Sequence, residues 1–345
     1  MKDKIFQGIG IPLDNSRREA INLFNEMVYT KKIEVEITGK CFCGENNFQI
    51  LSRFDRFGLP FGTKICKSCG LITQTIRIHP DSLSLFYETV YWPLINGINL
   101  ETTEMEHSKF ITAPKKDEST SFVLNHISKN KKEVKIFEVG CGAGIRISKL
   151  KSELQNLGHN VTAIGCDYSE NALLHAKKRG IKTVHGGFEE LVKKGKCDVL
   201  IMSHLFEHLP HLDVALEQIE SLVEKKTIIY IEVPGVIDLE NKIEYGYNYQ
   251  TYNVLAHTFN FSLNTLSKVM QSRNFKLVEG DEFIRSVFIK SEEETKTPLK
   301  SDYENIVKGL NRAYIKQQKI INRRNSPLLK YIKTLVKAIL GKQFI

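Results

Sequence analysis

The feature that most constrains this chain is a run of three glycines at alternate positions, directly after an apolar segment. Residues 136–139 read Ile-Phe-Glu-Val, and Gly140, Gly142 and Gly144 follow. The β-forming residues predict a buried strand, and the apolar spacing over 145–157 predicts a helix. Glycines let the backbone approach a ligand without Cβ clashes, and the first amides of a helix favour an electronegative group. The sequence therefore predicts a strand–turn–helix unit with a ligand at its turn.

The spacing of the glycines argues against a pyrophosphate cradle. The dinucleotide fingerprint G-x-G-x-x-G needs a third glycine, but Ile145 stands at that position, and Ile147 does so if counting starts from Gly142. The pattern present is E-x-G-x-G-x-G, which begins at Glu138. A ligand with a methionine-type tail needs only a turn on which the tail lies flat. The alternative interpretation of this motif is an ordinary glycine turn after a strand, with no ligand bound.

From Val134 onward, strand and helix patterns alternate, which predicts a mainly parallel sheet covered on both faces. The expected strands, the third of them with its turn, are 135–139, 161–166, 182–189, 197–203, 227–233, 275–278 and 286–289. The carboxyl ends of such strands face the ligand crevice. Asp167 ends the second strand, where a carboxylate can accept hydrogen bonds from ribose hydroxyls.

Three further segments carry a family resemblance. Glu-His-Leu stands at 207–209 after the fourth strand, Glu-Val-Pro at 232–234 ends the fifth, and His257 begins an H-x-x-x-F-S segment. With the glycine turn, these segments resemble class I S-adenosylmethionine (SAM)-dependent methyltransferases related to quinone-biosynthesis and sugar-modifying enzymes. The resemblance covers roughly residues 41–290 and implies a Rossmann-like α/β sheet of seven strands. The SAM-binding residues that it implies are Glu138, Gly140, Gly142, Gly144, Asp167, Tyr168, Gly187, Phe188 and Ser203. For Phe188, a role in the core is an equal alternative.

Two pairs of cysteines predict a structural zinc site in a small N-terminal lobe. The motifs C-F-C-G and C-K-S-C-G supply Cys41, Cys43, Cys66 and Cys69, and each pair is followed by a glycine that permits a tight turn. Four thiolates fill a tetrahedral coordination sphere, so the metal is expected to stabilise the lobe and not to catalyse. Unliganded cysteines or a redox pair are the alternatives. Sugar C-methyltransferases resemble this chain in having such a lobe, but the C-x-C spacing and the lack of their large C-terminal domain are departures.

The positive charge is concentrated at the C-terminal end. The net charge is +9, and residues 295–345 hold nine Lys and three Arg against Asp302 and Glu304, a local charge of +10. Two amphipathic helices are expected there, with apolar stripes formed by Tyr303, Ile306, Val307, Leu310, Tyr314 and Ile321, and by Leu328, Ile332, Leu335, Val336 and Ile339. The second helix could rest on an anionic membrane surface, a polysaccharide-assembly complex, another subunit or the protein's own body.

The division expected from these patterns is an N-terminal helix and zinc-binding lobe over 1–104, a SAM-binding domain over 105–294 and a basic helical tail over 295–345. Apolar runs are far shorter than a membrane span, and the first residues lack a secretory signal pattern. We therefore expect a cytoplasmic enzyme, with the inner membrane surface as an option through the tail. The oligomeric state is left open.

Two aromatic segments flank the predicted domain. Residues 86–92 are rich in aromatics, for which packing between domains is favoured over contact with substrate. Tyr245, Tyr247, Tyr249 and Tyr252 are expected to form a lid over a hydroxylated substrate, with packing on the domain's own surface as an equal alternative.

Methyl transfer to a poor nucleophile benefits from a general base, and histidine has a suitable pKa. His257 and His208 are the candidates, and Glu207 is expected to orient or polarise one of them. An ordinary polar contact is the alternative for each of the three.

The function expected from sequence is methylation of a sugar, nucleotide-sugar or glycan hydroxyl. C-methylation of a nucleotide-linked keto sugar is the close alternative. An RNA-binding methyltransferase is disfavoured because the body of the chain is near neutral and lacks a basic, aromatic-interleaved stripe. A nicotinamide-dependent sugar enzyme is disfavoured by Ile145 at the third glycine position.

Overall fold

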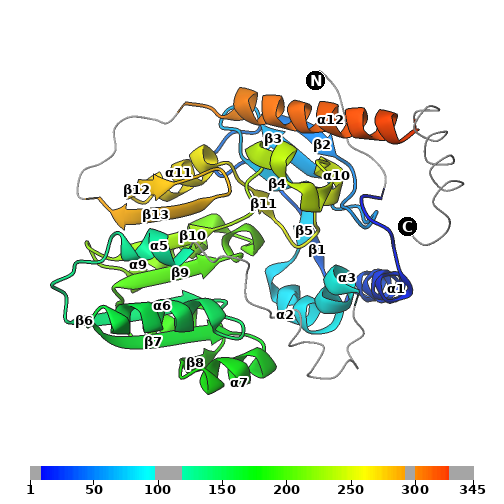
Figure 1. Ribbon diagram of the computed structural model, residues 1–345. Helices are drawn as coiled ribbons and strands as arrows, with labels where there is room; N and C mark the ends of the chain where they lie inside the picture. The colour runs from blue at the N-terminus through cyan, green and yellow to red at the C-terminus, as the bar shows by residue number, and fades with distance from the viewer. Residues whose placement is uncertain (1–8, 98–118, 292–299, 326–345) are drawn as a thin grey trace, which may run out of the picture.

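A computed structural model describes residues 9–97, 119–291 and 300–325 of the chain, and its largest element is a seven-stranded sheet. The strands are β6 (Glu133–Val139), β7 (Asn160–Asp167), β8 (Lys182–His185), β9 (Val199–Ser203), β10 (Ile228–Glu232), β12 (Phe275–Gly280) and β13 (Arg285–Lys290). Their order is β12-β13-β10-β9-β6-β7-β8, and β13 runs antiparallel to both of its neighbours. The predicted Rossmann-like sheet is present, with the reversed strand that the hairpin of the last two strands requires (Figure 1).

Helices cover both faces of this sheet. They are α5 (Ser119–Leu124), α6 (Ile145–Asn156), α7 (Glu170–Lys178), α8 (Phe188–Val192), α9 (Leu212–Leu222) and α11 (Leu263–Gln271). Neighbouring strand residues point to opposite layers: Ile136 packs with α5, α6 and α7, whereas Phe137 packs with α8, α9 and α11. A parallel strand covered on both faces needs apolar residues at consecutive positions, which explains the unbroken apolar run before the glycine turn.

The N-terminal lobe is built on two small antiparallel sheets. The first pairs β1 (Val35–Ile37) with β5 (Ile76–Ile78), and the second has the order β11-β4-β3-β2. Its strands are β2 (Phe48–Ser52), β3 (Thr63–Cys66), β4 (Ile72–Gln74) and β11 (Phe259–Asn260), and the lobe helices are α1 (Asn15–Tyr29), α2 (Leu83–Phe86), the π-helical η2 (Tyr87–Tyr91) and α3 (Trp92–Asn96). Strand β11 comes from the chain after β10, so one sheet combines residues of the lobe with residues of the central domain.

The C-terminal helix α12 (Tyr303–Asn325) packs back on the protein. Ile306, Leu310 and Ala313 are buried against Leu51 and Ile65 of the lobe sheet, and α12 lies along that sheet (Figure 1). The first predicted tail stripe is therefore covered by the protein's own body, although Ile321 near its end is 39% exposed. The second stripe, from Leu328 to Ile339, lies outside the described residues. Within the described part of the chain, no helix combines the length and apolar character needed to cross a membrane.

Candidate active site

The glycine turn has the conformation that its sequence predicts. Gly140, Gly142 and Gly144 have φ of 68°, 50° and 71°, a region that side chains with a Cβ rarely adopt. A Cβ on Gly144 would lie 2.8 Å from the Cβ of Ala176, so this glycine lets α6 and α7 approach each other. A Cβ on Gly142 would meet nothing within 4 Å. The middle of the turn thus has open space beside it.

Asp167 holds this turn from the end of β7. Its Oδ2 accepts a hydrogen bond from the Gly142 amide at 2.8 Å, and its Oδ1 accepts one from the Ser169 amide at 2.9 Å. Each carboxylate oxygen has a second lone pair for a ligand hydroxyl. Glu138 is buried at the end of β6, 3% exposed, two residues before the first glycine.

Phe188 and Tyr168, both predicted to bind SAM, differ in exposure. Phe188 is 5% exposed and packs in the core with residues of β7, which favours the alternative of a core role over contact with the cofactor. It opens helix α8, whose apolar face is buried against α9. Tyr168 is 59% exposed, and its hydroxyl would lie 2.8 Å from a Cβ on Gly187. Tyr168 is thus an exposed ring beside Gly187, a second residue predicted to bind SAM.

Ser203 belongs to a polar cluster at the ends of β9 and β10. Its hydroxyl donates to Glu232 Oε2 at 3.2 Å and accepts from the guanidinium of Arg146. Arg146, in the first turn of α6, also pairs with Glu232 Oε2 at 2.9 Å. The sequence had singled out Ser203, and the structure adds these two charged partners.

Glu207, His208 and His257 come together beside the glycine turn. One ligand atom from each lies within 4.8 Å of the others, and the rings of His208 and His257 meet edge to face at 4.8 Å. Leu205, in the same loop as Glu207, would lie 3.4 Å from a Cβ on Gly140. The structure therefore brings together all three residues predicted to be catalytic, next to the predicted cofactor turn.

The residues of this cluster differ in how their surroundings shift their pKa values. Glu207 is 2% exposed, and neither of its carboxylate oxygens has a hydrogen-bond partner among the described residues. Burial alone would raise the pKa of Glu207, but His204, His208 and His257 together lower it. Burial lowers the pKa of His208 and, with help from His208, lowers that of His257 to about 3. The cluster thus combines an ionised carboxylate with two neutral imidazoles, which can accept a proton.

Two tyrosines of η2 complete the site from the lobe. The hydroxyl of Tyr87 lies 3.1 Å from His208 Nδ1, and the ring of Tyr91 meets the ring of His208 edge to face at 6.3 Å. If Tyr87 donates to Nδ1, the proton of neutral His208 stays on Nε2, which lies 3.8 Å from Glu207 Oε1. The sequence had favoured interdomain packing for this segment; its buried residues Phe86 and Val90 do pack in the lobe, but its tyrosines reach the cluster.

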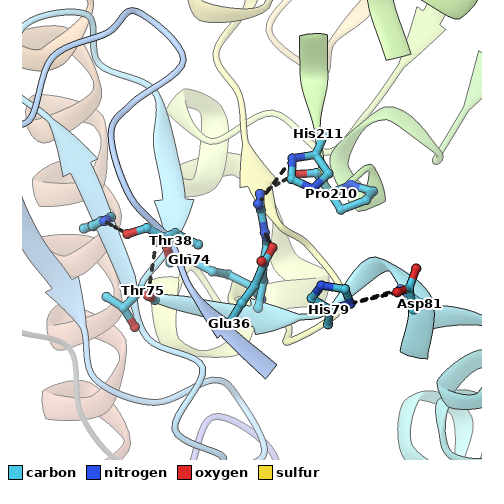
Figure 2. Close-up of polar contacts among 10 residues, drawn as sticks. Glu36, Thr38, Gln74, Thr75, His79, Asp81, Pro210 and His211 are labelled. Carbon is cyan, nitrogen blue, oxygen red and sulfur yellow. Dashed lines mark hydrogen bonds and ion pairs between the residues drawn. The ribbon is translucent and has the colours of Figure 1, made fainter. Parts of the chain in front are cut away.

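The lobe is attached to this region by charged contacts (Figure 2). Arg77 of β5 pairs with Glu36 at 2.6 Å, donates to the carbonyl of Pro210 and lies 3.4 Å from His211 Nδ1. Pro210 and His211 directly follow the segment that carries Glu207 and His208. The lobe therefore supports the loop on which two of the candidate catalytic residues lie.

Two of the four tyrosines expected to form a lid are core residues. Tyr249 and Tyr252 are each 1% exposed; Tyr249 bonds to Thr63 Oγ1 at 2.9 Å, and Tyr252 donates to the Pro234 carbonyl at 2.5 Å. The lid prediction is wrong for this pair, because the lobe sheet and α12 cover them.

The other two lie nearer the surface. The ring of Tyr245 packs edge to face on that of Tyr252, and the Lys316 ammonium lies 4.3 Å from the ring centre of Tyr247. Both rings are half-buried.

The four cysteines of the lobe converge. Cys41 Sγ lies 3.5 Å from Cys69 Sγ, and Cys43 Sγ lies 3.7 Å from Cys66 Sγ, with all four sulfurs within 4.8 Å of one another. A tetrahedral ion with Zn–S bonds of about 2.3 Å implies S···S separations of roughly 3.8 Å. The Leu71 amide also points at Cys69 Sγ, at 3.4 Å. The donor set and its spacing fit a zinc ion despite the C-x-C motif.

Comparison with known proteins bears on the central part of the chain. Residues 115–280 match the family model described as a methyltransferase domain, a segment slightly under half of the chain that includes the glycine turn, Asp167 and the Glu207, His208 and His257 cluster. The ubiquinone biosynthesis O-methyltransferase of Pelagibacter ubique (strain HTCC1062) is 29% identical over 114 residues, which cover 32% of this chain and 46% of that protein. The matched segment thus spans about half the length of this curated relative.

Some solved structures are distantly similar. A putative SAM-dependent methyltransferase from Listeria monocytogenes is 12% identical, with 52% of this chain and 100% of that chain covered and a TM-score of 0.38. The plantazolicin methyltransferase BpumL in complex with S-adenosylhomocysteine (SAH) is 15% identical, with 69% and 86% covered and a TM-score of 0.38. Likenesses this distant carry no functional argument. By the family match, the central part of the chain, residues 115–280, is a methyltransferase domain.

Proposed function

We propose that the protein is a SAM-dependent methyltransferase that methylates a hydroxyl of a sugar, nucleotide-sugar or glycan. The observation that carries the proposal is that the loop of Glu207 and His208, which meet His257, packs through Leu205 beside Gly140 of the glycine turn, which Asp167 holds. The name of the curated relative, an O-methyltransferase, supports an oxygen acceptor. The similarity of the sequence to sugar-modifying methyltransferases supports the carbohydrate.

The residues of the turn fit the proposed cofactor. Gly142 leaves open space beside the backbone, and the free lone pairs of Asp167 suit two vicinal hydroxyls. Tyr168 would lie against the adenine. When bound, SAM supplies an electrophilic methyl group on a sulfonium.

The chain's own residues orient the acceptor and take its proton. A neutral His257 accepts the proton of the acceptor hydroxyl, and the carboxylate of Glu207 stabilises the imidazolium that forms. Tyr87 fixes the ring of His208 beside them. His208 is the second candidate for the base; in that role its Nδ1–H donates to the Tyr87 hydroxyl, and Nε2 is free to accept the proton. Holding acceptor and methyl group on one axis is expected to supply most of the acceleration.

The lobe cysteines would hold a structural zinc ion. Four sulfur ligands close the coordination sphere, so the ion takes no part in the reaction, and its role is to maintain the lobe that supplies Tyr87 and Arg77. A cytoplasmic location is part of the proposal. Contact of residues 326–345 with a membrane or a complex stays a prediction.

Incubation with labelled SAM and a panel of nucleotide-sugars and glycan fragments tests the function. The expected result is label in a carbohydrate, lost in His257→Ala by about 10²–10⁴-fold in kcat, the usual contribution of a general base. If no carbohydrate in the panel becomes labelled, the proposal of a sugar acceptor is contradicted. A new C–C bond in the product, detected by NMR, would decide for C-methylation.

A further inference from the structure

One loop of the lobe brings a positive charge to the edge of the candidate active site. This loop, residues 53–62, joins β2 to β3 and is fixed to the segment that precedes His257. The Arg56 amide donates to the Asn253 carbonyl at 2.8 Å, and Gln250 Nε2 donates to the Asp55 carbonyl at 2.7 Å. The backbone of Arg56 is therefore held in place relative to His257.

The guanidinium of Arg56 lies 4.9 Å from the ring centre of Phe57 and interacts with the charge of the neighbouring Asp55, but it forms no ion pair within the described part of the chain. Its Nε is buried and has no hydrogen-bond partner there, and no ion pair is formed by this side chain among those residues. The carboxylate of the neighbouring Asp55 forms no ion pair with Arg56; it accepts hydrogen bonds from the backbone amides of Phe57, Leu59 and Leu255. An arginine in such a position keeps its charge, and burying part of the guanidinium without an ion-pair partner is unfavourable.

The charge of Arg56 acts on the candidate catalytic cluster. Burial lowers the pKa of His257, and the charge of Arg56 lowers it further. Burial raises the pKa of Tyr91 in η2 and of Tyr245, and the charge of Arg56 opposes that rise. Burial lowers the pKa of Arg56 itself, whereas interactions with Tyr245, Asp55 and Tyr91 raise it, and the charge of Arg17 makes a smaller contribution that lowers it. Arg17 is already paired with Asp14, so Arg56 is the cation at this edge that has an open bonding position.

We propose that Arg56 binds an anionic group of the acceptor, a phosphate or a carboxylate, and thereby places the acceptor hydroxyl beside His257. The inference rests on the proposed function and narrows its substrate class to anionic carbohydrates. The planar guanidinium can form two parallel hydrogen bonds with either group. A nucleotide-sugar would supply the charge through its diphosphate, and a uronic acid through its carboxylate.

Isothermal titration of the full chain, saturated with SAH, tests this proposal. The probes are inorganic pyrophosphate, glucuronate and neutral glucose, each at low and high salt. The matched pair of variants is Arg56→Gln and Arg53→Gln, because Arg53 lies on the same loop and is exposed. Arg56→Lys retains the positive charge but lacks the planar guanidinium that forms two parallel hydrogen bonds. Thermal melting checks that each variant is folded.

The wild-type protein is expected to bind pyrophosphate, glucuronate or both, more weakly at high salt, and to show no measurable binding of glucose. Arg56→Gln should weaken binding of the anion by about 10- to 100-fold, Arg56→Lys should bind with intermediate affinity, and Arg53→Gln should match the wild type. Binding of pyrophosphate alone assigns a phosphate, and binding of glucuronate alone assigns a carboxylate. The proposal is overturned if the wild type binds neither anion, or if Arg56→Gln binds as well as the wild type. Failure of SAH to bind would contradict the proposed function separately, since the anion titrations are repeated without SAH.

Discussion

At the scale of the residue, His257 shows how burial sets chemistry. Its ring lies in the cluster beside His208, its Nδ1 has no hydrogen-bond partner among the described residues, and its pKa is lowered to about 3. An ordinary histidine with a pKa of about 6.5 would lose its function as a base as pH falls below that value. A histidine with a lowered pKa remains neutral through that range.

This lowered pKa predicts the acid limb of the pH profile. As the pH falls from 8 to 6, kcat/KM should stay within about twofold, because His257, with its pKa lowered to about 3, gains no proton in that window. The profile is measured with a labelled methyl donor at saturating SAM. A fall of tenfold per pH unit that begins near 6.5 would show that the base has an ordinary pKa and would exclude His257 in its present environment.

At the scale of the element, Gly144 controls the packing of α6 on α7. Gly144→Ala should lower the free energy of unfolding by about 2–4 kcal/mol, because the new Cβ meets both strain at φ 71° and a contact of 2.8 Å with Ala176. Gly158→Ala is the matched control, since its φ is 91° but nothing lies within 4 Å of the new Cβ. Urea denaturation of both variants separates the backbone strain from the steric contact. An equal decrease in the free energy of unfolding for the two variants would contradict the packing argument.

A second element, the β2–β3 loop, depends on Asp55. This carboxylate is fully buried and accepts three backbone hydrogen bonds, from Phe57, Leu59 and Leu255. Asp55→Ala should cost about 2–4 kcal/mol, because it leaves three N–H groups without an acceptor. Asp81→Ala, at a side chain that is 92% exposed, should change stability by less than about 0.5 kcal/mol. A similar melting temperature for the two variants would count against this account.

Much of the central domain could be predicted from sequence, because its signals are local. The spacing of apolar residues and the turn-forming residues indicated the strands and the glycine turn. The rule that the carboxyl ends of parallel strands meet at one edge of the sheet placed Asp167 near the loop of Glu207. Tyr87, which contacts His208, and Arg56 could not be assigned in this way, since both belong to the lobe, more than a hundred residues earlier in the chain. The burial of Tyr249 and Tyr252 escaped prediction for the same reason: the lobe sheet and α12 that cover them are distant in sequence.

At the scale of the whole molecule, the lobe and the domain are connected through shared structure. Strand β11 pairs with β4 of the lobe just after His257, and Arg77 contacts the loop beyond His208. A disturbance of the lobe should therefore reach the candidate active site. The sheet that contains β3 and β4 also carries Cys66 and leads into Cys69.

Removal of the metal tests this connection. Elemental analysis should find one zinc ion per chain, and Cys69→Ser should lose it, with a melting temperature lower by about 5 °C or more. Cys197→Ala is the control, because this thiol lies in the central domain and should leave the zinc content unchanged. Purified protein with four reactive lobe thiols and no zinc would contradict the proposed site.

The central claim is that the turn of Gly140, Gly142 and Gly144, held by Asp167, binds the methyl donor, and equilibrium titration of SAH tests it most directly. The wild-type protein should bind SAH at one site per chain and should not bind NAD. Asp167→Ala should bind SAH at least about tenfold more weakly, because it loses charge-assisted hydrogen bonds to the ligand. Absence of SAH binding in the folded wild-type protein, or binding of NAD in its place, would contradict the account.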